Sequence, residues 1–159
     1  MTKKKSAGES LGVLLREHEE LVQLFDRHQR SLVRKDVDDA IAFFSKFQDG
    51  LSRHIAFEES RLLPKYAQEG GEVAGGTLAI FQAEHRKLLE MMGKLAKDCM
   101  ALFAAADLDG RIIAILDQET LFKGLLSHHM HREQNILIPR LEARTTASER
   151  RELLGHVKP

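Results

Sequence analysis

The chain has 159 residues, enough for one domain with a sizeable hydrophobic core. Lysine plus arginine and aspartate plus glutamate each number 24, so no net charge attracts nucleic acid or an anionic membrane. The basic start Lys3–Lys5 leads into Ser-Ala-Gly-Glu, and no apolar run approaches the roughly 18 residues of a membrane span. We therefore expect no secretory signal and no membrane anchor, and predict a cytoplasmic protein.

The first half of the chain predicts two long helices, because apolar residues recur every three or four positions. The first helix runs roughly from Glu9 to Arg34. The second begins near Asp36, a residue suited to an N-cap, and continues to Pro64, which should kink or end it. Glycines within residues 70–76 make the following connection flexible.

The second half predicts two further long helices with the same apolar spacing. One begins near Thr77 and stops before Asp107, and the other runs through Ile112 to about Pro139. Residues 146–149, Thr-Ala-Ser-Glu, match a capping box and predict a short C-terminal helix. Long helices joined by short connections pack as an antiparallel up-down four-helix bundle, so the predicted fold class is all-α.

The two halves of the chain repeat each other. A shift of 67 residues superimposes the first and third segments, and a shift of 75 superimposes the second and fourth. Leucine matches alone mean little, but the repeat also matches polar residues and a proline. We therefore predict a single domain over residues 1–159, with a core over 9–141 made of duplicated hairpins at 9–69 and 77–141. The matched pairs are Glu17 and Glu84, His18 and His85, His54 and His129, Glu58 and Glu133, and Pro64 and Pro139.

Six residues of metal-binding type lie on the apolar faces of these segments. A histidine and a glutamate four positions apart share one helix face, so each His-x-x-x-Glu pair points toward the core. Buried imidazoles and carboxylates without partners would destabilise a domain whose net free energy of unfolding is only about 5–15 kcal/mol. A pair of metal cations satisfies all six groups, and an ion-pair or polar network without metal is the alternative. The six residues are His18, His54, Glu58, His85, His129 and Glu133.

These motifs resemble the hemerythrin-like HHE cation-binding family. The stretch from His54 to Pro64 (HIAFEESRLLP) is similar to the family's signature, and the stretch from His129 to Pro139 (HMHREQNILIP) repeats it. The resemblance implies a non-haem centre of two iron ions with the four histidines as terminal ligands. It also implies that the two glutamates bridge the irons and that open positions remain for small ligands.

The chain differs from the oxygen-carrying hemerythrins at two positions. Those proteins have a further histidine where this chain has Leu89, and an aspartate where it has Gln134. We expect Leu89 to face the same metal as His85, and its apolar side chain to limit stable O₂ carriage. The pattern is closer to a four-histidine, two-glutamate group that includes di-iron proteins implicated in repair of nitrosative and oxidative damage. Ferritin-like bundles use Glu-x-x-His, with the order reversed.

The resemblance implies a metal-binding protein that meets O₂, NO or peroxide in oxidative or nitrosative stress response or in sensing. Manganese and zinc accept the same ligands as iron, so the pattern leaves the metal open. The alternatives are a metal- or gas-responsive regulatory bundle without turnover and an interaction bundle without metal. The expected partner is a diatomic molecule or a peroxide, with no nucleic acid and no membrane. Enzymatic turnover and oligomeric state are left open.

For several side chains near these motifs, the sequence predicts ordinary structural roles. Glu17, Glu59 and Glu84 turn away from the predicted ligands, so we expect them on solvated helix faces. His28 continues the inner stripe of the first helix, where a capping or packing role is expected. The single cysteine, Cys99, excludes an internal disulfide and lies on an apolar stripe as a plain buried thiol.

Overall fold

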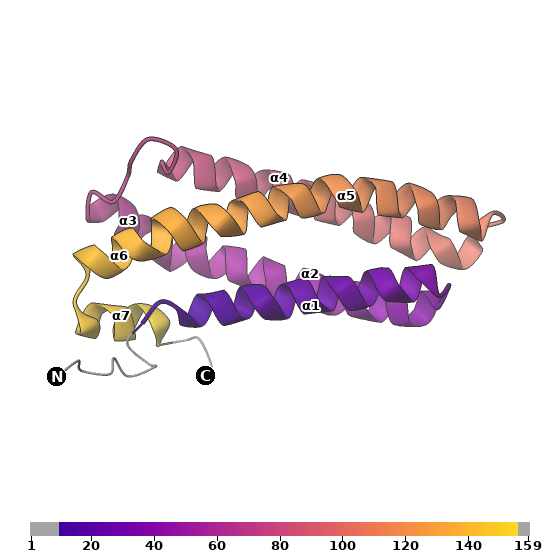
Figure 1. Ribbon diagram of the computed structural model, residues 1–159, viewed down its shortest axis with the longest axis horizontal. Coiled ribbons are helices and arrows are strands. Elements are labelled where there is room, and N and C mark those ends of the chain that lie inside the picture. The colour runs from indigo at the N-terminus through magenta and orange to yellow at the C-terminus, as the bar shows by residue number, and fades with distance from the viewer. Residues whose placement is uncertain (1–9, 156–159) are drawn as a thin grey trace.

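The structure is a computed structural model that describes residues 10–155. Four long helices make up most of it: α1 (Val13–Val33), α2 (Val37–Phe57), α4 (Leu78–Met100) and α5 (Leu108–Arg132). One hairpin is formed by α1 and α2 and the other by α4 and α5 (Figure 1). The hairpins pack together through α2 against α4 and α1 against α5. This arrangement confirms the predicted all-α, antiparallel up-down bundle.

Side-chain caps mark the start of three of the long helices. Each cap accepts a hydrogen bond from a backbone N–H in the first turn, which satisfies one of the amides that a helix leaves unpaired. The predicted starts near Asp36 and Thr77 are confirmed. The far end of α4 tightens into a short 3₁₀ turn, η2 (Ala101–Ala104), before the last cap. The caps are Asp36 on the N–H of Asp39, Thr77 on that of Ile80 and Asp107 on that of Gly110.

Two of the long helices widen into π turns before they end. The turn η1 (Glu58–Leu62) joins α2 to α3 (Leu63–Gln68), and η3 (Glu133–Leu137) joins α5 to α6 (Ile138–Arg144). In each case the first N–H after the turn donates to the carbonyl of the glutamate five residues earlier. The two π turns occupy matching places in the two halves, so the structural repeat extends to the backbone.

A proline follows each π turn. Pro64 lies in the first turn of α3, and Pro139 lies in the first turn of α6. A proline has no N–H to donate to the carbonyl four residues earlier, and its ring crowds that carbonyl. The regular α-helical ladder is therefore interrupted just before each proline. The chain stays helical through Pro64 to Gln68, so the proline is accommodated by a π turn and does not end the helix.

Two apolar clusters fill the interior, and the ligand-type histidines lie between them. On α1, for example, His18 lies between Leu14 of one cluster and Leu21 of the other. His54, His85 and His129 have the same position on their own helices. The larger cluster includes Phe25, Phe44, Phe47, Met92 and Phe122, and the smaller includes Leu11, Leu62, Tyr66, Phe81 and Leu141.

The short C-terminal helix, α7 (Ala147–Leu154), begins with the predicted capping box between Thr146 and Glu149. It lies beside the start of α1 and below α6 in Figure 1. The Nζ atom of Lys65 donates to Oε1 of Glu149 at 2.8 Å, and Leu154 joins the smaller apolar cluster. Within residues 10–155 no helix is both long and apolar enough to cross a membrane.

Candidate metal centre

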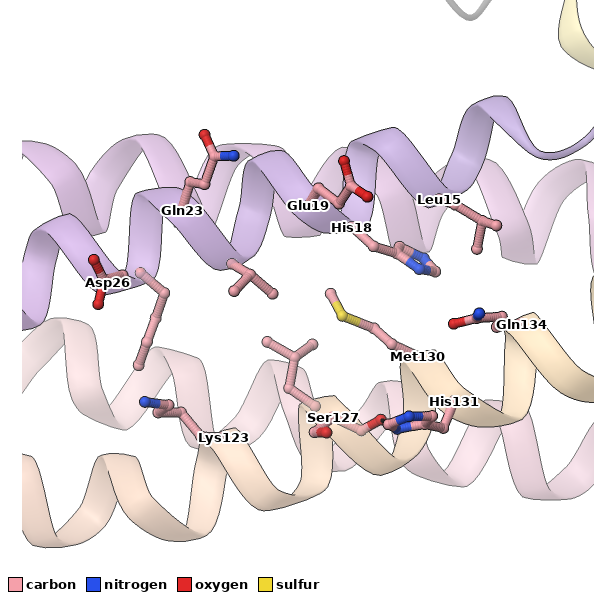
Figure 2. Close-up of a pocket in the computed structure, with 13 residues that line it drawn as sticks. Leu15, His18, Glu19, Gln23, Asp26, Lys123, Ser127, Met130, His131 and Gln134 are labelled. Atoms are coloured by element: carbon pink, nitrogen blue, oxygen red, sulfur yellow. Dashed lines mark hydrogen bonds between the residues drawn. The ribbon is translucent and has the colours of Figure 1, made fainter.

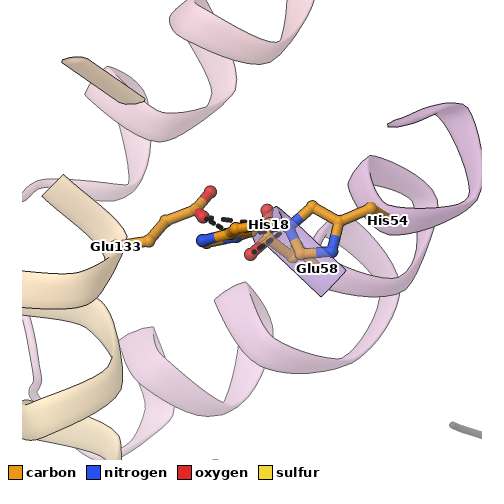
Figure 3. Close-up of side chains that lie close together, drawn as sticks. All are labelled: His18, His54, Glu58 and Glu133. Atoms are coloured by element: carbon orange, nitrogen blue, oxygen red, sulfur yellow. Dashed lines mark hydrogen bonds and ion pairs between the residues drawn. The ribbon is translucent and has the colours of Figure 1, made fainter. Parts of the chain in front are cut away.

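The structure brings together all six residues predicted as metal ligands. All are buried, with exposed fractions between 1% and 7%. Figure 3 shows four of them, with side chains that converge from helices on both sides of the bundle. The six are His18 from α1, His54 from α2, Glu58 from η1, His85 from α4, His129 from α5 and Glu133 from η3.

The donor atoms form two overlapping groups. Within each group the ligand-type atoms all lie within 4.8 Å of one another, which is compatible with a single metal ion. Both glutamates belong to both groups, whereas each histidine belongs to one. The geometry therefore suits two neighbouring ions that share two carboxylates. The groups are His18, His54, Glu58 and Glu133, and Glu58, His85, His129 and Glu133.

Each shared glutamate is the first residue of a π turn. Glu58 and Leu62, the first and last residues of η1, are 1% and 0% exposed, so the wider turn keeps both side chains in the core. π turns inside α-helices are rare and frequently occur at functional sites. Sequence reasoning missed them, although a proline six residues after each glutamate was the available signal.

A second set of carboxylates holds three of the four histidine rings. The expectation that these glutamates face solvent is wrong, since Glu84 is 12% exposed and the other two are 34% exposed at the side chain. A residue next to a ligand points about 100° away on its own helix, but a glutamate is long enough to reach a neighbouring helix. The Nδ1–carboxylate distances are 3.0 Å for His54 and Glu17, 2.7 Å for His85 and Glu59, and 2.9 Å for His129 and Glu84.

These contacts determine which ring nitrogen faces the centre. A carboxylate only accepts, so Nδ1 donates and the neutral ring presents a lone pair at Nε2. The Nε2 atoms of His85 and His129 are 3.1 Å apart, and those of His18 and His54 are 3.0 Å apart. Two lone pairs at such a distance repel each other. The His85–His129 pair therefore requires either an additional proton or a cation.

Protonation of the histidines alone does not give every buried oxygen of the centre a hydrogen-bond partner. Both carboxylate oxygens of Glu133 are buried and accept no hydrogen bond from any residue between 10 and 155. Nε2 of His129 lies against Oε1, and Nε2 of His18 lies 2.8 Å from Oε2, but closeness without alignment is not a hydrogen bond. A buried carboxylate without donors costs several kcal/mol, whereas a cation binds carboxylate oxygen and imidazole nitrogen together. The residues thus fit metal ions better than a hydrogen-bonded network.

The carboxylates also raise the proton affinity of the histidines. Burial lowers the pKa of His85, but Glu133 and Glu58 more than offset this and raise it to about 10. Burial likewise lowers the pKa of His129, and Glu133 with Glu84 raises it to about 9. Without metal, the raised pKa values favour protonation of this pair at neutral pH, and an incoming metal ion must displace the added proton.

A cavity of about 650 Å³ opens between α1 and α5 and reaches the centre at His18 (Figure 2). Its walls are largely apolar, and it includes Gln134, which follows the shared Glu133. Of the six candidate ligands, His18 alone lines this cavity, and it is also the most exposed of them at 7%. Small molecules can thus approach one side of the centre more easily than the other.

Other expectations from the sequence have mixed outcomes. Leu89 is 40% exposed while Leu88 is fully buried, so the expectation that Leu89 faces the metal is wrong. Cys99 is buried, and burial raises the pKa of its thiol to about 12, which confirms an unreactive core residue. His28 is a packing residue as expected, and its Nε2 lies 2.6 Å from Oε1 of Glu119.

Comparison with known proteins agrees with this geometry. Searches of curated proteins and of solved structures found no match. A sequence model of the family described as Hemerythrin HHE cation binding domain matches residues 9–141, a range that contains the six buried residues and both π turns. On the basis of this match over most of its length, the chain belongs to the hemerythrin HHE cation-binding domain family.

Proposed function

We propose that this protein binds two iron ions side by side, with Glu58 and Glu133 shared between them. The observation that carries the proposal is the membership of both glutamates in both donor groups. In addition, the carboxylate oxygens of Glu133 accept no hydrogen bond from the described part of the chain. Imidazole nitrogen and carboxylate oxygen form a ligand set that suits iron. Manganese and zinc accept the same donors, so metal analysis is part of the test.

We further propose that the centre meets O₂, NO or peroxide, in oxidative or nitrosative stress response or in sensing. Bound iron would supply redox chemistry and open coordination positions for such ligands. The protein contributes a core that excludes bulk water, carboxylates that orient three imidazoles, and a cavity that ends at His18. The small size of these ligands suits a centre whose donors are at most 7% exposed.

A second candidate is a regulatory bundle that responds to metal or gas without turnover. One observation favours it: each of the four long helices contributes one histidine to the centre. A change in the occupancy of the centre therefore acts on both hairpins at once. Altered helix packing is a general route from such a local change to the binding of a partner.

The two candidates are separated by metal analysis and optical absorption of protein purified anaerobically from its native host. We expect two iron ions per chain and a change of absorption when air, NO or peroxide is added. Folded protein with one ion or none contradicts the two-metal centre, and an unchanged spectrum contradicts the small-ligand role. A reversible change without consumption of the ligand indicates sensing, and consumption indicates an enzyme.

A further inference from the structure

The duplicated halves do not place equal groups behind their histidines. Glu59 follows one shared glutamate, and the same shift of 75 residues places Gln134 after the other. Glu59 accepts from Nδ1 of His85 at 2.7 Å. Gln134 lines the cavity with His18 (Figure 2), and no carboxylate of the described chain pairs with Nδ1 of His18. Three histidines thus have a carboxylate behind the ring, and His18 does not.

The carboxylate behind His85 also has support of its own. Nε2 of Gln82 donates to Oε2 of Glu59 at 3.4 Å, which helps to fix the side chain that orients the ring. The residue that matches Gln82 in the first half is Leu15, which has no polar group to offer. Leu15 lines the cavity beside His18, so the whole arrangement behind His85 is replaced by apolar surface and an amide behind His18.

The carboxylates behind His129 and His54 also differ in how firmly they are held, and the firmer one again lies on the His85–His129 side. Nε of Arg132 donates to Glu84 at 3.1 Å, and Glu84 is 12% exposed at its side chain. The residue that matches Arg132 in the first half is Phe57, so the corresponding Glu17 has no arginine donor at the matching position. The side chain of Glu17 is 34% exposed. Glu84 is therefore held more firmly behind His129 than Glu17 is held behind His54.

These differences bear on metal affinity. A carboxylate that accepts from the outer nitrogen of a ligating histidine fixes the ring and makes the inner nitrogen a stronger donor, and its loss typically costs roughly 10–100-fold in affinity. The two shared glutamates serve both ion positions, so they do not distinguish between them. The His85–His129 side has two outer carboxylates, Glu59 and Glu84, and each accepts a further hydrogen bond from a neighbouring side chain. The His18–His54 side has one outer carboxylate, Glu17.

We infer that the two ion positions are unequal and that Gln134, where the other half has Glu59, makes the largest contribution to the difference. The position held by His85 and His129 fills first and binds more tightly, and the position held by His18 and His54 is exchangeable. This inference rests on the two-metal centre proposed above. The protein then passes through a one-metal form, in which the second position responds to metal availability while the first stays filled.

The test is a titration of metal-free, full-length protein with Zn²⁺ against a competing chelator. Wild-type protein should show two dissociation constants that differ by roughly 10–100-fold. Gln134→Glu should lower the dissociation constant of the weaker position and so reduce the ratio between the two constants. Glu59→Gln should raise the dissociation constant of the tighter position. Gln23→Glu adds a charge to the same cavity away from the repeat position, so both constants should stay unchanged.

Single-histidine variants assign the positions. His18→Ala should keep one ion with the tighter constant, and His85→Ala should keep one ion with the weaker constant. The reverse order overturns the inference, as do equal constants in wild-type protein or an unchanged pair of constants in Gln134→Glu. Binding of one ion or none by folded wild-type protein instead overturns the two-metal centre itself, so the two failures are distinguishable.

Proton NMR of the zinc-loaded protein provides a readout that a merely structural role of these residues would not change. An Nδ1–H that donates to a carboxylate makes a short, charge-assisted bond and resonates far downfield. Gln134→Glu should move the Nδ1–H signal of His18 downfield, and Glu59→Gln should move that of His85 upfield. A change of affinity without these shifts overturns the assignment of Gln134 and Glu59 as positioning residues.

Discussion

Two buried histidine–carboxylate clusters lie in the same bundle and differ in how their polar atoms are satisfied. In the larger apolar cluster, His28 and Glu119 are both fully buried. Nδ1 of His28 lies 2.7 Å from the carbonyl oxygen of Ala40, and Nε2 lies 2.6 Å from Oε1 of Glu119. Gln29 donates to the other oxygen of Glu119 at 2.8 Å. Both ring nitrogens and both carboxylate oxygens therefore have partners within the protein.

The metal centre has the same residue types and similar burial, but within residues 10–155 the carboxylate oxygens of Glu133 lack such partners. In the His28–Glu119 pair each ring nitrogen lies beside an oxygen atom, and each carboxylate oxygen lies beside a nitrogen atom. In the centre, Nε2 atoms face each other and the oxygens of Glu133 accept no hydrogen bond within the described part of the chain. Burial alone thus does not distinguish a structural histidine from a metal ligand. The two differ in whether the buried polar atoms of the cluster have hydrogen-bond partners within the protein.

The largest effect should come from removing one carboxylate of each cluster. Glu58→Ala and Glu133→Ala should each lose both ions, because each glutamate belongs to both donor groups. Glu119→Ala should keep both ions, yet lose about 3–5 kcal/mol of unfolding free energy because a buried ion pair has lost one partner. Metal content and urea unfolding of the three variants, purified identically, measure the two effects.

Glu119→Gln serves as the milder control for that comparison. It keeps an oxygen acceptor for His28, so it should fold where Glu119→Ala is too unstable to study, and it should also keep two ions. Loss of metal from Glu119→Gln would mean that the two clusters are coupled. If Glu58→Ala and Glu133→Ala each kept one tightly held ion, the protein would have two separate mononuclear sites and no shared pair.

Removal of metal with a chelator should lower the thermal midpoint of unfolding by about 10 °C for each tightly bound ion. An ion present at a thousandfold above its dissociation constant contributes about 4 kcal/mol. A domain of this size shifts by about 2–4 °C for each kcal/mol. Glu119→Gln should show the same shift as wild type, since the clusters are independent, and Glu133→Ala should show none. Equal midpoints of wild-type protein with and without metal would indicate a core that is complete without ions.

The protonation of the centre predicts opposite pH trends for metal-free stability and for metal affinity. In metal-free protein the pKa is raised from 6.5 to about 10 for His85 and to about 9 for His129. Because these folded-state values exceed the unfolded ones, the stabilisation is complete below pH 6.5 and is lost as pH rises through 9 to 10. Metal affinity should rise over the same interval, because fewer protons must be displaced.

Urea unfolding of the metal-free protein and chelator competition of the loaded protein, at the two ends of that pH interval, measure these trends. Glu119→Gln is expected to follow wild type in metal affinity at both ends. If metal-free stability instead rises with pH, the histidines of the centre are neutral without metal. The repulsion between the Nε2 atoms of His85 and His129 would then have to be relieved by movement of the helices.

The fold and the six inward residues could be predicted because their signals are local and periodic. Apolar residues every three or four positions define the helices, and a histidine and glutamate four apart share a face. The repeat of His54 and Glu58 as His129 and Glu133 then separates the centre from an isolated core histidine. The cap at Asp36 and the helix start near Thr77 were likewise readable from residue type and position.

The outer carboxylates could not be predicted because their contacts lie between helices. On its own helix Glu59 points away from the direction of Glu58, and only the packing of α2 against α4 brings it to His85. The available signal was that Glu17 and Glu84 repeat with the same shift as the histidines beside them. The π turns were missed for a related reason, since one extra residue in a turn leaves the amino-acid pattern almost unchanged.

The smallest effect is expected at Leu89, where the oxygen-carrying hemerythrins have a further histidine. Leu89 is 40% exposed, so Leu89→His should place its imidazole in solvent, change stability by less than about 0.5 kcal/mol and leave metal content and optical spectrum unchanged. Leu88 is fully buried on the neighbouring face of α4, so Leu88→His should destabilise the protein by about 2 kcal/mol or more through an unpaired buried imidazole. A new spectrum from Leu89→His would show that α4 can rotate its exposed face toward the centre. The absence of a fifth histidine from the centre would then depend on residue identity at this position, and not on the orientation of α4.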